Sequence, residues 1–196
     1  MIQDKEIKYD VGVIHGRFQI LHNDHMKYLL AGKNLCNHLI IGITNPDPSL
    51  TRDSKTNPHR STPLANPLSY YERYVMLREV FKEKGFKLSE FSIVPFPINI
   101  PELIKYYVPM NAVFFLSIYD DWGRKKKKYL ESLGLKIHVL RDVSLEEKGL
   151  NSREIRDAMI NGKPWEHLLP LSIVKLMKEW DIINRLKEIS LNQDNW

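Results

Sequence analysis

The segment Val11–His25 reads VGVIHGRFQILHNDH, and it decides the fold. Its first residues, Val11–Ile14, form an apolar run that favours a buried strand. Beyond the turn, residues Asp24–Leu35 carry apolar side chains at helical spacing. A strand that passes through a turn directly into a helix is the opening unit of an α/β fold. Ligands of such folds bind outside the carboxyl ends of the strands, so this turn is the first place to look for chemistry.

The rest of the chain alternates in the same way. Four further strand-like runs follow, at His38–Thr44, Phe91–Phe96, Ala112–Ser117 and Lys136–Leu140. Helical spacing is found at Ser69–Lys84, Arg124–Leu133, Ser152–Asn161 and Pro170–Ser190, the last with a candidate break near Asp181. This alternation predicts α/β architecture with a single doubly wound, Rossmann-like parallel sheet and C-terminal helices. We expect one Rossmann-like domain over residues 1–170, with residues 171–196 packed on it as a C-terminal helix.

Composition narrows the class of protein. The 196 residues are 43% hydrophobic and 27% charged, which is typical of a folded globular chain. No apolar run is long enough to span a membrane. Cys36 is the only cysteine, so no intrachain disulfide can form, and a reducing, cytoplasmic location is expected. The net charge of +5 suits anionic ligands in general and does not single out nucleic acid.

A polar, proline-rich stretch separates the second predicted strand from the next helix. Residues Asn45–Pro67 contain five of the eleven prolines and predict a long loop rather than regular structure. Loops of this length in a compact domain are usually functional or disordered. We expect this loop to close as a lid over one of two substrates, the acceptor of a transferred group. The acceptor-binding candidates are Thr44, Asn45, Arg60 and Arg73.

The turn after the first strand offers groups suited to phosphate. Gly16 permits a close backbone approach to a ligand. His22 and His25 are three residues apart near a helix start, so both imidazoles lie on one face. The helix N-terminus adds N–H groups and a partial positive charge, which attract anions, and imidazoles there can donate hydrogen bonds to phosphate in a transition state. A two-histidine metal site is the alternative, but no clustered cysteine or Glu-x-x-His partner accompanies it.

Four segments together resemble a known superfamily. Residues Gly16–His25 (GRFQILHNDH) resemble the GRFQPxHxGH signature of the nucleotidyltransferases, and most of all their archaeal-type nicotinamide mononucleotide adenylyltransferases. Three later segments match in the expected order: NPLSYYER at 66–73, FFLS at 114–117 and NSREIR at 151–156. The resemblance covers residues 11–170, and its first motif is the most specific.

The resemblance implies a reaction. A phosphate-bearing acceptor attacks the α-phosphorus of a Mg-NTP in line, pyrophosphate leaves, and the protein positions the groups and neutralises charge. The implied substrates are ATP and nicotinamide mononucleotide, which give NAD, and the implied cofactor is Mg²⁺ brought by the NTP. A cytidylyltransferase that uses CTP and a small phosphate or phosphonate is the alternative, because such enzymes share the first motif. A non-catalytic nucleotide- or RNA-binding module is the alternative of another class. The expected partners are small molecules, without membrane or nucleic acid, and a homo-oligomer is left open.

The resemblance also implies a role for individual residues. The catalytic residues would be His22, His25 and Arg17. The two histidines would hold the triphosphate and stabilise the transition state, and Arg17 would lie near the β- and γ-phosphates or the acceptor phosphate. Arg73, on the helix after the loop, is a further phosphate candidate. The nucleotide- and phosphate-binding set is Gly16, Phe18, Gln19, Asp24, Ser117, Trp122, Ser152, Arg153 and Arg156.

Two parts of that set can be made more specific. Ser152, as N-cap of the late helix, and Arg156 would bind the β- and γ-phosphates by hydroxyl, backbone N–H and guanidinium. The turn after Ser117 would recognise the base, with Trp122 either stacking on it or packing in the fold.

Other features receive no functional expectation. The basic run Arg124–Lys128 would spread around more than a full helical turn, so we predict a solvated face rather than a nucleic-acid site. The remaining histidines are not assigned a role; they are His15, His38, His59, His138 and His167.

The chain departs from the superfamily pattern at two positions. Asp24 stands where the signature has glycine, and Arg153 stands where the late motif has threonine. A carboxylate near a triphosphate is unfavourable, so we hypothesise that Asp24 and Arg153 offset one another, as a direct ion pair or through a shared Mg²⁺–phosphate cluster that Asp24 faces. The alternative is that Asp24 caps the helix and points at solvent.

Overall fold

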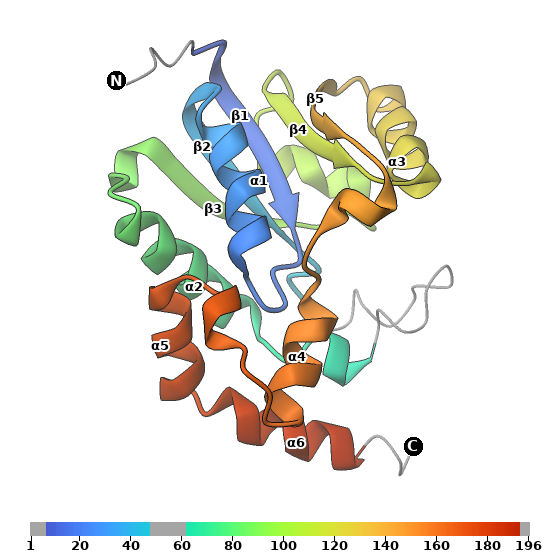
Figure 1. Cartoon of the computed structure of the whole chain (residues 1–196). Helices are drawn as coiled ribbons and strands as arrows, with labels where there is room; N and C mark the ends of the chain where they lie inside the picture. The colour runs from blue at the N-terminus through green and yellow to red at the C-terminus, as the bar shows by residue number, and fades with distance from the viewer. Residues whose placement is uncertain (1–6, 48–61, 193–196) are drawn as a thin grey trace.

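The computed structural model describes residues 7–47 and 62–192. Five parallel strands form one sheet in the order β3-β2-β1-β4-β5 (Figure 1). Their bounds are Tyr9–Gly16 for β1, Cys36–Thr44 for β2, Phe91–Phe96 for β3, Val113–Ile118 for β4 and Lys136–Asp142 for β5. Strand order reverses between β1 and β4, so the predicted doubly wound, Rossmann-like fold is confirmed.

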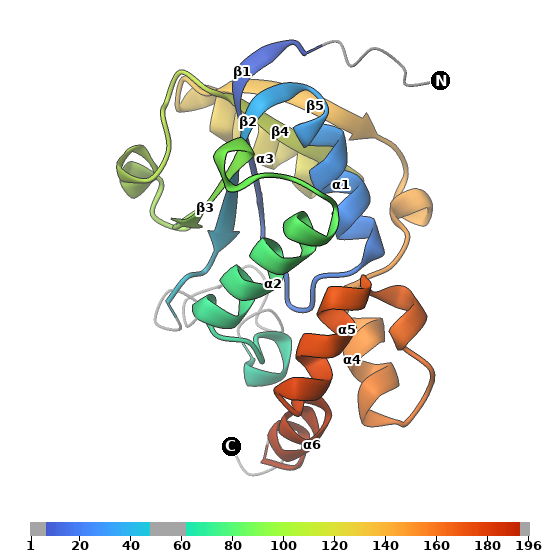
Figure 2. The same ribbon diagram turned by 90° about the vertical axis from the view of Figure 1, so that its left-hand side faces the viewer.

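The described residues form six α-helices. They are α1 (Asn23–Lys33), α2 (Tyr70–Glu83), α3 (Asp121–Ser132), α4 (Ser152–Ile160), α5 (Leu171–Glu179) and α6 (Ile182–Asn192). Short 3₁₀ turns occur at Pro63–Ala65 (η3), Leu88–Glu90 (η4), Pro101–Tyr106 (η5), Leu145–Lys148 (η6) and Glu166–Leu168 (η7). Helices α1 and α2 cover one face of the sheet and α3 covers the other (Figure 2).

Each face of the sheet has its own apolar core because successive strand residues point to opposite sides. On β1, Ile14 belongs to the core shared with α1 and α2, whereas Val13 belongs to the core under α3 and η5. Both side chains are fully buried, as expected for a parallel sheet covered on both faces.

The C-terminal segment, for which the sequence predicts one helix with a candidate break near Asp181, consists of two helices. It forms α5 and α6, and the chain turns between them at Asp181, where φ is +50°. Ile173 and Ile182, one from each helix, are fully buried in the same core as α1 and α2. Among the described residues, no helix combines the length and apolar character needed to cross a membrane.

The start of α3 also differs from the sequence expectation. Helix α3 begins at Asp121 rather than Arg124, because the side chain of Asp120 caps it and accepts a hydrogen bond from the Gly123 N–H at 2.8 Å. Arg60, and most of the loop predicted to act as a lid, lie outside the described residues.

Candidate active site

The turn after β1 folds back onto the sheet. Phe18, at φ +53°, is fully buried, and its ring fills the space beside Gly16, where a Cβ would meet it at 2.8 Å. The ring of Phe18 therefore occupies the position of a side chain at residue 16, and the close approach of a ligand to the Gly16 backbone stays a prediction. Phe18 itself is a core residue and offers no surface to a nucleotide, because the turn buries its aromatic side chain in the core.

Gln19 also serves the fold rather than a ligand. Its side-chain amide donates to the Leu68 carbonyl at 2.8 Å and accepts from the Leu68 N–H at 2.9 Å. Gln19 is only 2% exposed. This two-point contact fixes the turn to the segment that leads into α2, so the Gln19 side-chain amide positions the signature turn.

His22 and His25 lie together at the start of α1. Their rings stack with centroids 3.7 Å apart, so the expectation that both lie on one face holds in the structure. His22 is the N-cap, and the contacts are reciprocal: the Nδ1 of each ring accepts from the backbone N–H of the other residue at 3.4 Å. A neutral imidazole whose Nδ1 accepts carries its proton on Nε2. The Nε2–H of His22 is left as a donor, whereas in His25 a hydrogen bond to the backbone of Ile20 acts to raise the pKa, so a phosphate oxygen would have to replace that carbonyl.

Both imidazoles are neutral in the folded protein. Burial lowers the pKa of His22 to about 4, with the charge of Asp24 acting weakly in the opposite direction. Burial also lowers the pKa of His25 well below its usual range, helped by His22 and by the positive charge of Arg17. Arg17 therefore lies close enough to act on His25. Two neutral donors beside a helix N-terminus can bind an anion without an initial proton transfer.

Helix α4 lies directly below this turn (Figure 1) and is joined to it by side chains. The Ser152 hydroxyl donates to the Ile20 carbonyl at 3.1 Å. Because that hydroxyl has one proton, it is not available to donate to phosphate. Asn151, not Ser152, is the N-cap, since its side chain accepts from the N–H groups of Arg153 and Glu154. The expected phosphate role of the Ser152 hydroxyl is corrected to one of joining two segments.

Arg156 is a buried cation of this site. It is 6% exposed, and its guanidinium donates to the Gln19 carbonyl. Its Nε is buried and has no hydrogen-bond partner within the described part of the chain. An unpaired donor on a buried cation is costly, and a phosphate oxygen would satisfy it. Burial also lowers the pKa of Arg156.

Asp24 and Arg153 do not meet. Asp24 accepts a hydrogen bond from the Leu150 N–H at 2.7 Å and pairs with Lys27 at 2.6 Å. Arg153 has a largely exposed side chain and lies 3.7 Å from Asp157 on its own helix. The hypothesis of a direct ion pair is wrong, because each residue has a nearer partner. The alternative, a cap that points at solvent, is wrong as well, since the Asp24 carboxylate reaches the segment before α4.

The acceptor candidates are arranged around Arg73. This residue is 3% exposed, and its guanidinium donates to the carbonyls of Arg17, Thr44, Asn45 and Ser69. Four of its N–H groups are therefore used on backbone, which makes it a residue that positions the ends of β1 and β2 rather than a phosphate ligand. Burial lowers its pKa to about 10. Thr44 is buried, and the Asn45 side chain accepts from Asn99 at 3.3 Å.

The proposed base-binding turn follows β4. Ser117 is half-buried at the end of that strand, and Trp122 is 53% exposed at the start of α3. The Nζ of Lys126 lies 5.3 Å from the centre of the Trp122 ring. Trp122 is thus available at the surface and is not a core residue.

Sequence reasoning missed one residue of this region, His15. It is the penultimate residue of β1 and is 4% exposed, yet neither ring nitrogen has a hydrogen-bond partner among the described residues. Its ring stacks on Phe96 of β3, with centroids 4.6 Å apart. A lone histidine before a glycine forms no recognisable motif, so only the structure singles it out.

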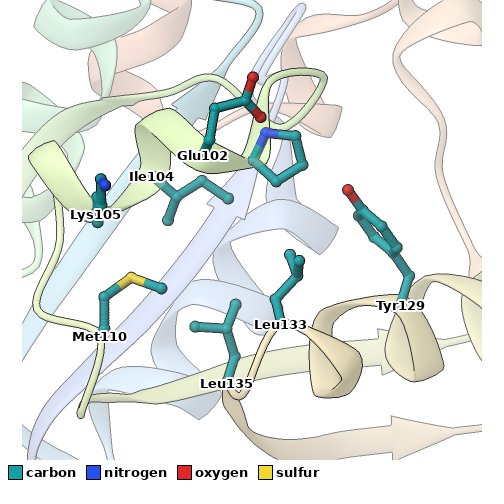
Figure 3. Close-up of a pocket in the computed structure, with 8 residues that line it drawn as sticks. Glu102, Ile104, Lys105, Met110, Tyr129, Leu133 and Leu135 are labelled. Carbon is teal, nitrogen blue, oxygen red and sulfur yellow. The ribbon is translucent and has the colours of Figure 1, made fainter.

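A hollow of about 300 Å³ lies away from all these groups. Glu102, Lys105 and Tyr129 surround it, as Figure 3 shows, together with residues from the ends of η5 and α3. Two lining residues, Met110 and Leu135, shortly precede β4 and β5. The hollow is therefore at the amino ends of the strands, opposite to the edge that carries the signature.

Comparisons of the sequence with known proteins identify relatives of this chain. The model of the cytidylyltransferase-like family matches residues 13–158. Phosphonoformate cytidylyltransferase of Streptomyces viridochromogenes is 42% identical over 90% of this chain and 95% of its own. Nicotinamide-nucleotide adenylyltransferase of Pyrococcus abyssi is 31% identical over 94% of this chain and 91% of its own.

One solved structure shows the same fold. A bifunctional NMN adenylyltransferase/ADP-ribose pyrophosphatase of Francisella tularensis matches with a TM-score of 0.63 at 19% identity, over 92% of this chain. The match spans 53% of that longer protein. The same protein has also been solved with AMP and a manganese ion. From the family match and its named relatives, this chain belongs to the cytidylyltransferase-like family and is a nucleotidyltransferase.

Proposed function

We propose that this enzyme transfers CMP from CTP to a small acid that carries a phosphonate or phosphate group. An acceptor oxygen forms a bond to the α-phosphorus, the bond from that phosphorus to the bridging oxygen breaks, and pyrophosphate leaves. The sequence favoured AMP transfer to nicotinamide mononucleotide and kept CTP as the alternative. The 42% identity to a cytidylyltransferase, against 31% to the adenylyltransferase, supports the alternative.

The single structural observation that carries the proposal is the buried Nε of Arg156, which has no partner among the described residues. It lies on a helix that contacts the signature turn through Gln19. A triphosphate placed between α1 and α4 would give this donor its acceptor. The guanidinium would then stabilise the charge that grows on the pyrophosphate as it leaves.

In this proposal the two histidines act on the same phosphates from the other side. Their Nε2–H groups would donate to oxygens of the α- and β-phosphates, with Arg17 beside His25. Neutral donors already held by a reciprocal cap need little reorganisation when charge moves onto the phosphates. The chain does no covalent work, and positioning with charge stabilisation accounts for the catalysis.

We propose that Mg²⁺ arrives with the NTP rather than on a protein site. Within residues 7–47 and 62–192, no three His, Cys, Asp or Glu side chains are grouped to hold a metal. The carboxylate of Asp24 is engaged by Leu150 and Lys27, so it does not fit the metal-facing role considered for it. The buried, unpaired Cys36 accords with a cytoplasmic location.

Adenylyl transfer to nicotinamide mononucleotide is the second candidate. It is favoured by the match of the Pyrococcus abyssi relative over 94% of this chain. The experiment that separates the two incubates the purified protein with Mg²⁺, each of the four NTPs and either phosphonoformate or nicotinamide mononucleotide. We expect pyrophosphate release only with CTP and phosphonoformate. Release with ATP and nicotinamide mononucleotide alone would establish the second candidate.

A further inference from the structure

His15 has a local environment that is unfavourable for folding alone. It lies at the carboxyl end of β1, and both ring nitrogens are buried without a partner among the described residues. A neutral imidazole needs one acceptor and one donor, and leaving both unsatisfied in an apolar setting costs free energy. An apolar residue at this position would avoid that cost. Violations of this kind are expected where a side chain serves a ligand.

The neighbours of His15 place it towards β2 and β3 at the carboxyl edge of the sheet. The phosphate motif at residues 151–156 follows β5, on the other half of that edge. The His15 ring stacks on Phe96, at an interplanar angle of 13°, so it leans towards β2 and β3. Arg156 and Ser152 instead follow β5, and they contact the turn through Gln19 and Ile20. In a doubly wound sheet two ligands can meet at the reversal of strand order, one on each half.

The charge near His15 is positive. Burial lowers the pKa of His15 well below its usual range, and the positive charge of Lys126 on α3 lowers it further. Lys126 is half-buried on α3, a helix that packs on β4 and β5. Phe96, on which the His15 ring stacks, belongs to the core on the face of the sheet that α3 covers, so His15 and Lys126 come from opposite halves of that face. A flat donor backed by an aromatic ring, with an ammonium nearby, suits a small anionic group.

We propose that His15 and Lys126 form a subsite for a second acidic group of the acceptor, the group that does not react. This inference rests on the proposed function and refines it: the acceptor class becomes a small diacid with a phosphonate or phosphate and a carboxylate or similar anion. His15 donates a hydrogen bond to that anion and Lys126 supplies opposite charge. His15 is thus a residue that determines specificity and takes no part in bond breaking.

The test compares phosphonoformate, which has a carboxylate, with methylphosphonate, which has none. The variants are His15→Phe, which keeps a flat ring without nitrogens, and Lys126→Gln. The matched control is Lys128→Gln, which removes the same charge from the same basic run at an exposed position. We expect both variants to lower kcat/KM for phosphonoformate by about 10- to 100-fold and to leave methylphosphonate within a small factor. Lys128→Gln should keep the wild-type preference.

The unfolding temperature of His15→Phe distinguishes the subsite from a purely structural role of His15, because a structural role predicts that the variant unfolds at a lower temperature. Because His15→Phe removes two unsatisfied nitrogens, it should keep or raise the unfolding temperature while it lowers the preference for the diacid. The subsite would be overturned if His15→Phe lowered the unfolding temperature and kept the wild-type preference for phosphonoformate over methylphosphonate. It would also be overturned if Lys126→Gln kept that preference.

A binding measurement separates failure of this inference from failure of the proposed function. If wild type turns over neither phosphonate, the proposed function is wrong. The subsite is then judged by the rise of the unfolding temperature with phosphonoformate alone. A saturable rise in wild type that is lost in His15→Phe and Lys126→Gln supports it, and no rise in wild type overturns it.

Discussion

The carboxylate of Asp24 accepts a hydrogen bond from the backbone N–H of Leu150 at 2.7 Å, across 126 residues of sequence. Ser152 and Arg156 make two further contacts between the same segments, on the carbonyls of Ile20 and Gln19. The helix that begins at the signature and the helix that carries Arg156 are therefore held at a fixed distance. Asp24, which stands at the position of the signature glycine, makes one of these three contacts.

The first prediction concerns Asp24 and Arg153. Asp24→Gly should lower stability by about 1.5–3 kcal/mol, the usual contribution of a hydrogen bond to a charged group, and Asp24→Asn should lose less. Because Arg153 contacts Asp157 and not Asp24, combining Asp24→Gly with Arg153→Thr should give additive effects within about 0.5 kcal/mol. Urea unfolding of wild type, Asp24→Gly, Arg153→Thr and the double variant measures the additivity, and Asp24→Asn is unfolded alongside them. A coupling of more than about 1 kcal/mol would restore the ion-pair hypothesis.

The second prediction uses Gly149, which has a φ of +76° and where a Cβ would lie 2.3 Å from Oδ2 of Asp24. Gly149→Ala should be strongly destabilising, from backbone strain together with this clash. Gly134→Ala is the matched control, since its φ is +79° and it has open space around it. In an Asp24→Gly background the excess cost of Gly149→Ala over Gly134→Ala should shrink. An excess that persists there would show that Asp24 is not what Gly149 accommodates.

The third prediction concerns pH. The pKa of His22 is lowered to about 4 in the folded protein. The unfolded chain, with a pKa of about 6.5, therefore takes up the proton first as the pH falls. The stability that neutral His22 contributes is complete well above pH 6.5 and is lost as the pH falls towards 4, with about 1.4 kcal/mol lost by pH 5.5. His22→Asn should flatten this part of the pH dependence in chemical unfolding. Parallel curves for the variant and wild type would contradict it.

The fourth prediction compares two arginines of one helix. Arg156→Gln should lower kcat/KM for CTP by about 10²–10³-fold, because it removes a buried charge-assisted donor from the triphosphate. Arg153→Gln, at a largely exposed position, should change kcat/KM by only a small factor. Steady-state kinetics with varied CTP measures both. Equal losses in the two variants would mean that only the summed charge of α4 matters.

The sequence was sufficient to predict the sheet and to choose the edge of the sheet that carries the candidate site. Alternating apolar segments and the GRFQ signature after β1 identify both, because strand periodicity and the strand-end rule are local properties. The contacts that hold the site were not predictable. Gln19 and Arg73 have the types expected of ligands, but both bind backbone carbonyls or amides more than 25 residues away in sequence. Their partners are set by tertiary packing.

His15 shows the opposite case. Nothing local distinguishes it from a core histidine, and its significance comes from the absence of a partner for its nitrogens among the described residues. Asp24 was partly predictable, because its departure from the signature glycine could be seen in the sequence. Its partner, the Leu150 N–H, is a backbone group, and no side-chain pattern points to it.

The most direct test of the account measures His25→Asn in a single turnover of CTP with phosphonoformate, alongside CTP binding. His25 lies stacked on His22 with centroids 3.7 Å apart, and its donor is proposed to strengthen only as charge moves onto the phosphates. We predict a rate of CMP transfer lowered by about 10²–10³-fold and a Kd for CTP within a few-fold of wild type. An unchanged transfer rate would contradict the assignment of this histidine pair as the catalytic centre.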